Sequence, residues 1–465
     1  MQVALDREAI EGFAAQRGFT DTLRALNVNQ SRQRLLELIR VHDVLQREAP
    51  DLLGQTGFGV AYGQFKGQPQ AAMNWVVSYP SFGFWCRVAY ELTERQAHIK
   101  MPGMHIASHL RTFPRFLLSA AWKAQSVLET PVAVDVHGNL VFPGWRLALI
   151  LGNDFAGRTV LCHVKRDVLE VDLGGHFTLT IPQSALGDAV LEAQLLAEIK
   201  PKGVLARFPR VAAGFIEIND SDDDLRLPGR VKVEFQALDD VSTVEWQEML
   251  SEAWETLLDT DAALAAEVRA TLRVVVPVVS SNPRKHLSAT YSETWGVVHM
   301  SYSHHVAVIL EALVHEYMHN KLNTLLSVDP LVVGPTNEAI FYSPFRSDPR
   351  PLLGILHAIF AFHGVTRFWE VFLRRPQPHA DWAWIQRRAH ELHYNVQIAI
   401  NDLQGVAQLT PIGKTLLDTI AESLSGVALP AVSPSVFEEL MQHEAVQRQN
   451  WEKLYGHSTA TIGEA

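Results

Sequence analysis

The chain has 465 residues, a length that predicts two to four structural units. It is 47% hydrophobic and 20% charged, which excludes wholesale disorder. Forty Lys and Arg against 51 Asp and Glu give a net charge of −11, which argues against a general nucleic-acid binder because such proteins carry a basic excess.

Residues 1–129 are predicted to form an N-terminal helical region. The segment RQRLLELIRVHDVLQ repeats apolar residues at intervals of three and four, and Ser31 before it can serve as an N-cap. Residues 51–75 are rich in Gly and Gln and are expected to form a loop. Within them, GFGVAYG misses the spacing of a dinucleotide-binding fingerprint, so we interpret it as a turn.

Residues 130–241 are predicted to form a β-rich middle region. Short β-branched segments such as RTVLCHVK and HFTLTIP, bounded by turn residues, indicate an antiparallel sheet. The acidic run NDSDDDLRLPGR resembles a calcium loop, but Leu225 and Val231 stand where that loop needs Gly and a carboxylate. We therefore expect a solvated acidic loop.

Residues 242–465 are predicted to form a C-terminal helical region. One or two helices follow Ser242, RVVVPVVSS and WGVVHMS are strands, and a long helix runs from about His305 to Leu326. The expected fold is α+β and predominantly helical, with the long helix packed on a small antiparallel sheet.

The chain shows no secretory signal, and its longest apolar stretch, 351–369, is interrupted by His and Arg. Two cysteines, Cys86 and Cys162, are too few for a disulfide framework. We expect a cytoplasmic protein that binds neither membranes nor nucleic acids.

The long helix contains the motif His315-Glu316-Tyr317-Met318-His319. A spacing of four places both imidazoles on one face, one turn apart, where they can bind one metal ion. Glu316 beside them could act as a base or orient a ligand. The alternative is two packed histidines, which would need polar partners if buried.

Two residues are candidates for a third ligand. Glu338 follows His319 by 19 positions, the spacing of a gluzincin-type zinc peptidase, although it could instead cap a helix. His357 lies in the apolar segment PLLGILHAIFAF, where it could instead be a core histidine. Two His and one carboxylate would suit zinc or iron equally.

The segment YSPFRSDPRP (342–351) is stiffened by three prolines and carries Arg346 and Arg350. Arginine forks bind carboxylates in a bidentate manner, so the segment is predicted to bind a small dicarboxylate. The alternative is a surface loop with an Arg–Asp pair.

These motifs, in this order, resemble the HExxH-motif peptide-modification proteins, which are similar to iron(II)- and α-ketoglutarate-dependent peptide β-hydroxylases of ribosomal peptide natural-product pathways. The specific resemblance covers about 290–370, and the Arg-rich helix near the N-terminus agrees loosely. It implies iron ligation by His315, His319 and His357, with Arg346 and Arg350 holding α-ketoglutarate.

The resemblance also implies that molecular oxygen is consumed and that a precursor peptide is hydroxylated at a β-carbon. It predicts ligands on one helix, unlike the double-stranded β-helix of most α-ketoglutarate enzymes. This sequence departs from the family pattern at Phe345, where Trp is usual, and at the additional Glu338.

Two other functions are considered. A zinc metallopeptidase would use Glu316 as base and Glu338 as third ligand. A peptide-binding protein would have a structural metal or none. The hydroxylase hypothesis predicts that the imidazoles converge, that His357 faces the metal helix, and that one arginine points into the cavity while Asp348 braces the other.

Overall fold

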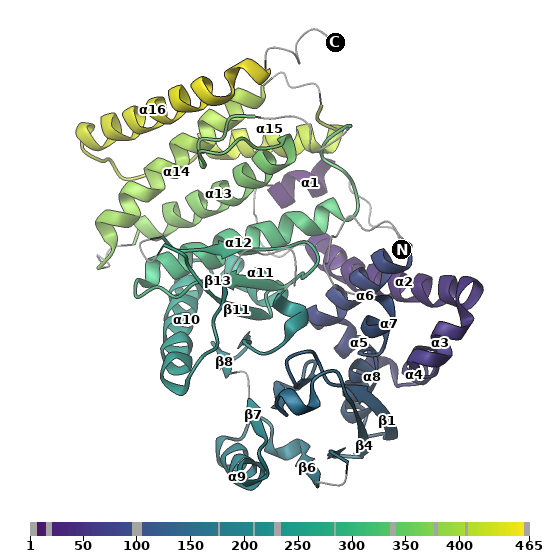
Figure 1. Cartoon of the computed structure of the whole chain (residues 1–465). Helices are drawn as coiled ribbons and strands as arrows, with labels where there is room; N and C mark the ends of the chain where they lie inside the picture. The colour runs from purple at the N-terminus through teal and green to yellow at the C-terminus, as the bar shows by residue number, and fades with distance from the viewer. Residues whose placement is uncertain are drawn as a thin grey trace.

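The computed structural model describes residues 7–14, 21–94, 105–174, 177–207, 210–226, 234–282, 285–334, 341–375, 380–404 and 408–459. Within these ranges the fold is α+β and predominantly helical, and none of its sheets closes into a barrel, as predicted (Figure 1).

The N-terminal region is helical, and its helices are α1 (Arg7–Ala14), α2 (Asp21–Glu48), α3 (Pro50–Thr56), α4 (Phe58–Lys66), α5 (Gln70–Val77), α6 (Pro80–Thr93), α7 (Ile106–Leu110) and α8 (Pro114–Lys123). The expected loop at 51–75 is therefore wrong. Phe58, Tyr62 and Phe65 recur at helical spacing and are all buried, which stabilises α4 despite its glycines. Gly57, at φ +70°, separates α3 from α4.

The middle region contains two antiparallel sheets, as expected from its alternating pattern. One has the order β1-β4-β5-β6 and the other β2-β3-β7. Their strands are β1 (Val127–Ala133), β2 (Asn139–Phe142), β3 (Leu147–Ile150), β4 (Thr159–Lys165), β5 (Val168–Asp172), β6 (Thr178–Pro182) and β7 (Leu205–Arg207), with α9 (Ala189–Ile199) between β6 and β7.

A third sheet has the order β12-β13-β11-β9-β8, with β10 paired to β11. It comprises β8 (Arg210–Ala212), β9 (Ile216–Ile218), β10 (Glu234–Phe235), β11 (Val274–Val279), β12 (Ser288–Ala289) and β13 (Val297–Met300). The sheet predicted to lie beneath the helix 305–326 is mixed rather than antiparallel, since β11 runs parallel to both β9 and β13. Helices α10 (Asp240–Thr260) and α11 (Ala262–Thr271) supply the crossover that parallel pairing of β9 and β11 requires.

The C-terminal helices are α12 (Val306–Leu326), α13 (Leu352–Leu373), α14 (Trp382–Leu403), α15 (Pro411–Ser425) and α16 (Pro434–Thr459). The predicted helix 305–326 is thus confirmed. Among the described helices, α13 is long and apolar enough to cross a membrane, but 67% of its apolar window is buried, as in a core helix.

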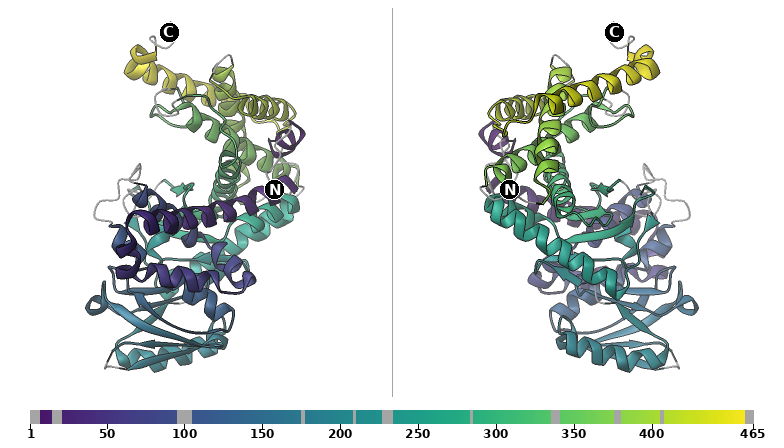
Figure 2. Two further views of the ribbon diagram at one scale, coloured as in Figure 1. Left: turned by 90° about the vertical axis from the view of Figure 1, so that its right-hand side faces the viewer. Right: turned by 90° about the vertical axis from the view of Figure 1, so that its left-hand side faces the viewer.

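Two large cores divide the chain differently from the three predicted regions. One joins α1 and the start of α2 to α10–α15, and the other joins the rest of α2, α4–α6 and α8 to the two antiparallel sheets. Figure 2 shows the C-terminal helices at one end of the molecule, the β-rich region at the other, and α2 between them. The helix α2 therefore belongs to both cores.

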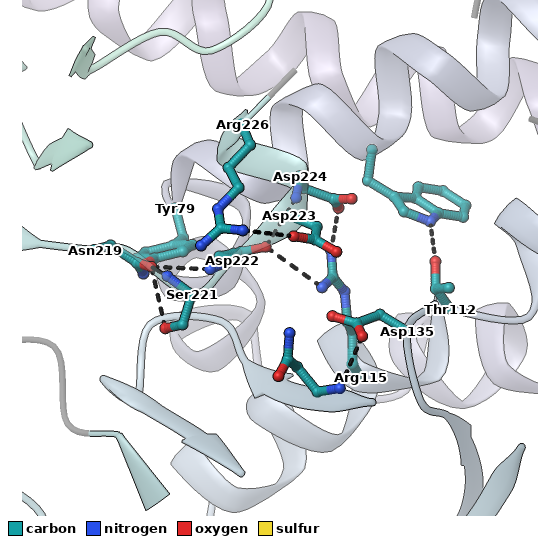
Figure 3. Close-up of polar contacts among 12 residues, drawn as sticks. Tyr79, Thr112, Arg115, Asp135, Asn219, Ser221, Asp222, Asp223, Asp224 and Arg226 are labelled. Carbon is teal, nitrogen blue, oxygen red and sulfur yellow. Dashed lines mark hydrogen bonds and ion pairs between the residues drawn. The ribbon is translucent and has the colours of Figure 1, made fainter. Parts of the chain in front are cut away.

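The described part of the acidic run after β9, residues 219–226, is buried or partly buried, so the expected solvated loop is wrong. Asn219, Ser221 and Asp222 are each less than 5% exposed. Arg115 of α8 forms ion pairs with Asp222 and Asp224, and Arg226 forms one with Asp223 (Figure 3). Arg226 also donates to the Asp220 carbonyl. Arg115 lies more than 100 residues before these aspartates in the sequence. Its ion pairs therefore join the loop to a distant helix, α8, of the other core.

Candidate functional site

The HExxH motif lies on α12, which packs against β12, β13 and α13. His315 and His319 share the face toward α13, as the spacing of four requires. On another face of α12, Tyr317 and Lys321 both contact the buried carboxylate of Glu267 on α11. The helix is therefore anchored on one side while it presents its imidazoles on the other.

The structure brings three imidazoles into contact. His315 Nε2 lies 3.0 Å from His319 Nε2, and His319 Nδ1 lies 3.2 Å from His357 Nδ1. The predicted placement of His357 is therefore met: α13 packs along α12 and turns this residue toward it. The two leading histidines do not occupy separate packing environments.

Burial keeps these imidazoles neutral. It lowers the pKa of His315 to about 3 and that of His357 to about 4, and it places the pKa of His319 well below its ordinary value. Neutral imidazole is the form that ligates metals, and the Nε2 atoms of His315 and His319 face each other. The donor chemistry therefore fits a metal ion.

The prediction that the three imidazoles converge on one point is wrong, because the three rings do not point at one centre. His319 presents opposite nitrogens to its two neighbours, so one ion cannot bind both contacts, and no set of three His, Cys, Asp or Glu in the described ranges is arranged as a complete metal site. Two nitrogens bound at about 2.1 Å would be about 3.0–3.4 Å apart. The pair His315–His319 meets that separation, and His357 lies alongside it.

A cavity of about 770 Å³ opens onto the imidazoles. Its lining residues are Ser288, Ala289, Thr290, Tyr291, Ser292, Glu293, His315, Glu316, His319, Asn323, Ser343, Phe345, Arg346, Arg350, Gly354, His357, Ala358 and Phe362. It therefore combines the helical motif, the β12 edge and the Arg-containing segment, three features far apart in sequence. Its size suits a small cosubstrate with part of a larger ligand.

Both predicted arginines line this cavity, but they differ in exposure. The Arg346 side chain is 60% exposed and Arg350 is 31% exposed, and both pair with Asp348 at 2.9 and 3.2 Å. Arg350 Nε is buried with no hydrogen-bond partner, which leaves it able to bind a ligand. Asp348 thus braces both arginines rather than one.

Phe345 stacks on Phe362 of α13 with ring centroids 4.5 Å apart. The ring of His315 also contacts Phe362, at 4.4 Å between centroids. The aromatic pair forms an apolar wall beside the imidazoles.

Glu316 faces β12 from the cavity wall. Burial raises the pKa of its carboxyl to about 7, while hydrogen bonds from Ser288 and Thr290 lower it in part. Its Oε2 is buried with no partner. Thr290 and Asn320 also donate to the backbone carbonyl of Glu316, which fixes this turn of α12.

Some residues that surround the candidate site could not be predicted from the sequence. Ser288 and Thr290 belong to or follow a two-residue strand, too short for a periodic pattern. Arg388 of α14, which forms an ion pair with Glu311 and helps lower the pKa of His315, is one of many surface-type arginines in the sequence. The competing ligand Glu338 lies outside the described residues.

A scan against models of protein families finds no match to this chain, and a search among curated proteins finds no significant relative.

Proposed function

We propose that this protein is an iron(II)- and α-ketoglutarate-dependent oxygenase that hydroxylates a β-carbon in a ribosomally made precursor peptide. The observation that carries the proposal is the shared cavity: three neutral imidazoles lie on one wall and Arg350, with an unpaired buried Nε, lies on another. A dicarboxylate cosubstrate needs a cation at some distance from its metal ligands, which a peptidase has no evident need for.

Iron would be held by His315 and His319, whose Nε2 atoms face each other, while His357, the third ligand that the resemblance implies, contacts the opposite nitrogen of His319 in this structure. Bound iron and α-ketoglutarate supply the oxidation of a C–H bond by molecular oxygen. The protein's own part is to keep the imidazoles neutral, to orient the cosubstrate through Arg350, and to exclude water with Phe345 and Phe362.

A peptide substrate is supported by the strand β12. It is the outermost described strand of its sheet, and Ser288 and Ala289 line the cavity. An edge strand offers backbone N–H and C=O groups to an extended peptide, which would place the peptide beside the imidazoles. Glu316, directly behind β12, would orient a ligand or hold a proton there.

One observation favours the second candidate, a zinc metallopeptidase. Glu316 lies on the cavity wall with an unpartnered oxygen and a pKa near that of a general base at neutral pH. In that function Glu338 would be the third ligand.

The test is production of succinate from α-ketoglutarate by full-length protein loaded anaerobically with iron(II) and then exposed to oxygen. We expect succinate with iron and none with zinc. Proteolysis of a peptide mixture by the zinc-loaded protein, without succinate from the iron-loaded protein, would contradict the hydroxylase and favour the peptidase.

The matched variants are Arg350→Gln and Arg346→Gln, which remove the same charge from the same segment. Loss of a partly desolvated charged contact costs about 2–5 kcal/mol, so Arg350→Gln should raise the half-saturating α-ketoglutarate concentration by roughly 30-fold or more. Arg346→Gln should change it less than about threefold because that side chain is solvated. Iron content should be equal in both. An equal response of the two variants would remove Arg350 as the cosubstrate's partner.

A further inference from the structure

A second cavity, of about 550 Å³, adjoins the first. His357, Asn323, Ser292 and Glu293 line both cavities, so His357 stands at the boundary between them. The far wall of the second cavity comes from α2 and α6. Its volume lies in the range of ligand sites, and nothing in the reaction with the cosubstrate alone requires it.

The cavity contains a buried arginine that lacks a carboxylate partner. Arg34 of α2 is 5% exposed, its Nη1 donates to the Val77 carbonyl at 3.0 Å, and its Nη2 is buried with no partner. No carboxylate within the described ranges lies at ion-pair distance from it. Glu37, one turn further along α2, pairs instead with Arg87 at 3.1 Å.

The surrounding structure is shaped to hold this guanidinium. It lies over the ring of Trp295, 5.5 Å from the centroid. It also lies directly against Gly83 of α6, where any Cβ would collide with it. An isolated buried charge destabilises a fold unless a partner compensates it, so a site that preserves one is suited to an anionic ligand.

We propose that Arg34 binds a carboxylate of the peptide substrate, either an acidic side chain or a free C-terminus, while the residue to be modified lies in the first cavity. This inference rests on the proposed function. Arg350 lines the first cavity, which contains all three imidazoles. Arg34 lines the second cavity, and His357 lines both. A guanidinium fork binds a carboxylate in a bidentate manner, which would fix the register of the peptide.

The experiment measures retention of peptides, not turnover. Full-length immobilised protein is incubated with end-blocked heptapeptides randomised except for a central Asp or Asn, and with a second pool bearing Asn and a free C-terminal carboxylate. Mass spectrometry gives the ratio of acidic to neutral peptides retained. We expect one acidic pool to be enriched about tenfold or more by the wild type, and the ratio to fall to about one for Arg34→Gln.

The control is Arg40→Gln, which removes the same charge from α2 at an exposed position paired with Glu94 and should keep the wild-type ratio. Gly83→Ala provides a second variant that keeps the charge but displaces the guanidinium, and it should also lose the enrichment. Equal ratios for wild type and both cavity variants would overturn the proposal.

A calorimetric titration with α-ketoglutarate distinguishes the other source of a carboxylate. We expect Arg34→Gln to bind the cosubstrate like the wild type; loss of that binding would assign Arg34 to the cosubstrate and overturn the inference. Retention of a peptide does not depend on turnover. If acidic peptides are enriched through Arg34 but the protein produces no succinate, the proposed hydroxylase function is contradicted and the binding of a carboxylate by Arg34 is not.

Discussion

Glu217 of β9 shows how the fold changes the chemistry of single residues. Its carboxyl is 6% exposed and accepts hydrogen bonds from Tyr79 at 2.7 Å and Asn219 at 2.6 Å. Burial raises its pKa from 4.5 to about 7, and the two hydrogen bonds offset only part of this rise. The same balance of burial against hydrogen bonding acts on Glu316 in the candidate site, where the raised pKa suits proton handling.

A pH dependence of stability follows from Glu217. The folded protein holds the proton up to about pH 7, whereas the unfolded chain loses it near pH 4.5, so this group's contribution to stability is lost as pH rises between these values. Urea unfolding at pH 5 and pH 8 should show the wild type losing up to about 3 kcal/mol relative to Glu217→Gln.

Tyr79→Phe provides the complementary measurement. Its hydroxyl donates to Glu217 and lowers the pKa of that carboxyl, so its removal should move the loss of stability to higher pH. A difference between wild type and Glu217→Gln that is the same at both pH values would show that Glu217 does not titrate in this range.

At the scale of the element, α12 has two functions on different faces. Its imidazoles face α13, and on another face Lys321 pairs with Glu267 of α11 at 2.9 Å, with both side chains 2% exposed. Tyr317 donates to the same carboxylate. A buried ion pair fixes the rotation of a helix more strictly than apolar packing does, and here that rotation sets where the motif points.

Replacing one partner of the Lys321–Glu267 ion pair should destabilise the protein more than replacing both partners with apolar residues. Glu267→Gln leaves a buried ammonium without its charge partner and should cost about 3–5 kcal/mol in urea unfolding. The double variant Glu267→Met with Lys321→Met should lose less than the sum of the two single Met variants. Additive losses would mean that the two residues act independently.

At the scale of the whole molecule, the first helix shares a core with α10–α15, far along the chain. Phe13 of α1 stacks on Phe360 of α13 at 5.5 Å and lies 5.0 Å from Lys321 Nζ. The short first helix therefore packs among the C-terminal helices, mainly against α15, and Figure 1 shows it there. Phe116 of α8 occupies a comparable place in the other core, in edge contact with Phe82.

The two cores should respond separately to loss of a buried ring. Phe13→Ala should cost about 3–5 kcal/mol and reduce hydrogen-exchange protection in α12 and α13, while β4 and β5 keep theirs. Phe116→Ala should do the reverse. Equal loss of protection in both cores from either variant would show that the molecule unfolds as a single unit.

The sequence by itself determined the features that depend on neighbours along the chain. The spacing of His315 and His319 places them on one helical face, and strand alternation predicted the antiparallel sheets, because both follow from local backbone geometry. The helix after Pro351 was predictable for the same reason. The family resemblance rests on these motifs and remains a prediction.

Only the tertiary structure decided which distant segments meet. It placed α1 in the C-terminal core, buried the acidic loop against Arg115, and brought Arg34 to a cavity bounded by His357. It also ordered β9, β11 and β13 as parallel neighbours. These contacts join residues tens to hundreds of positions apart, and periodicity carries no record of which buried faces pack together, because that choice depends on the shapes of all the elements at once.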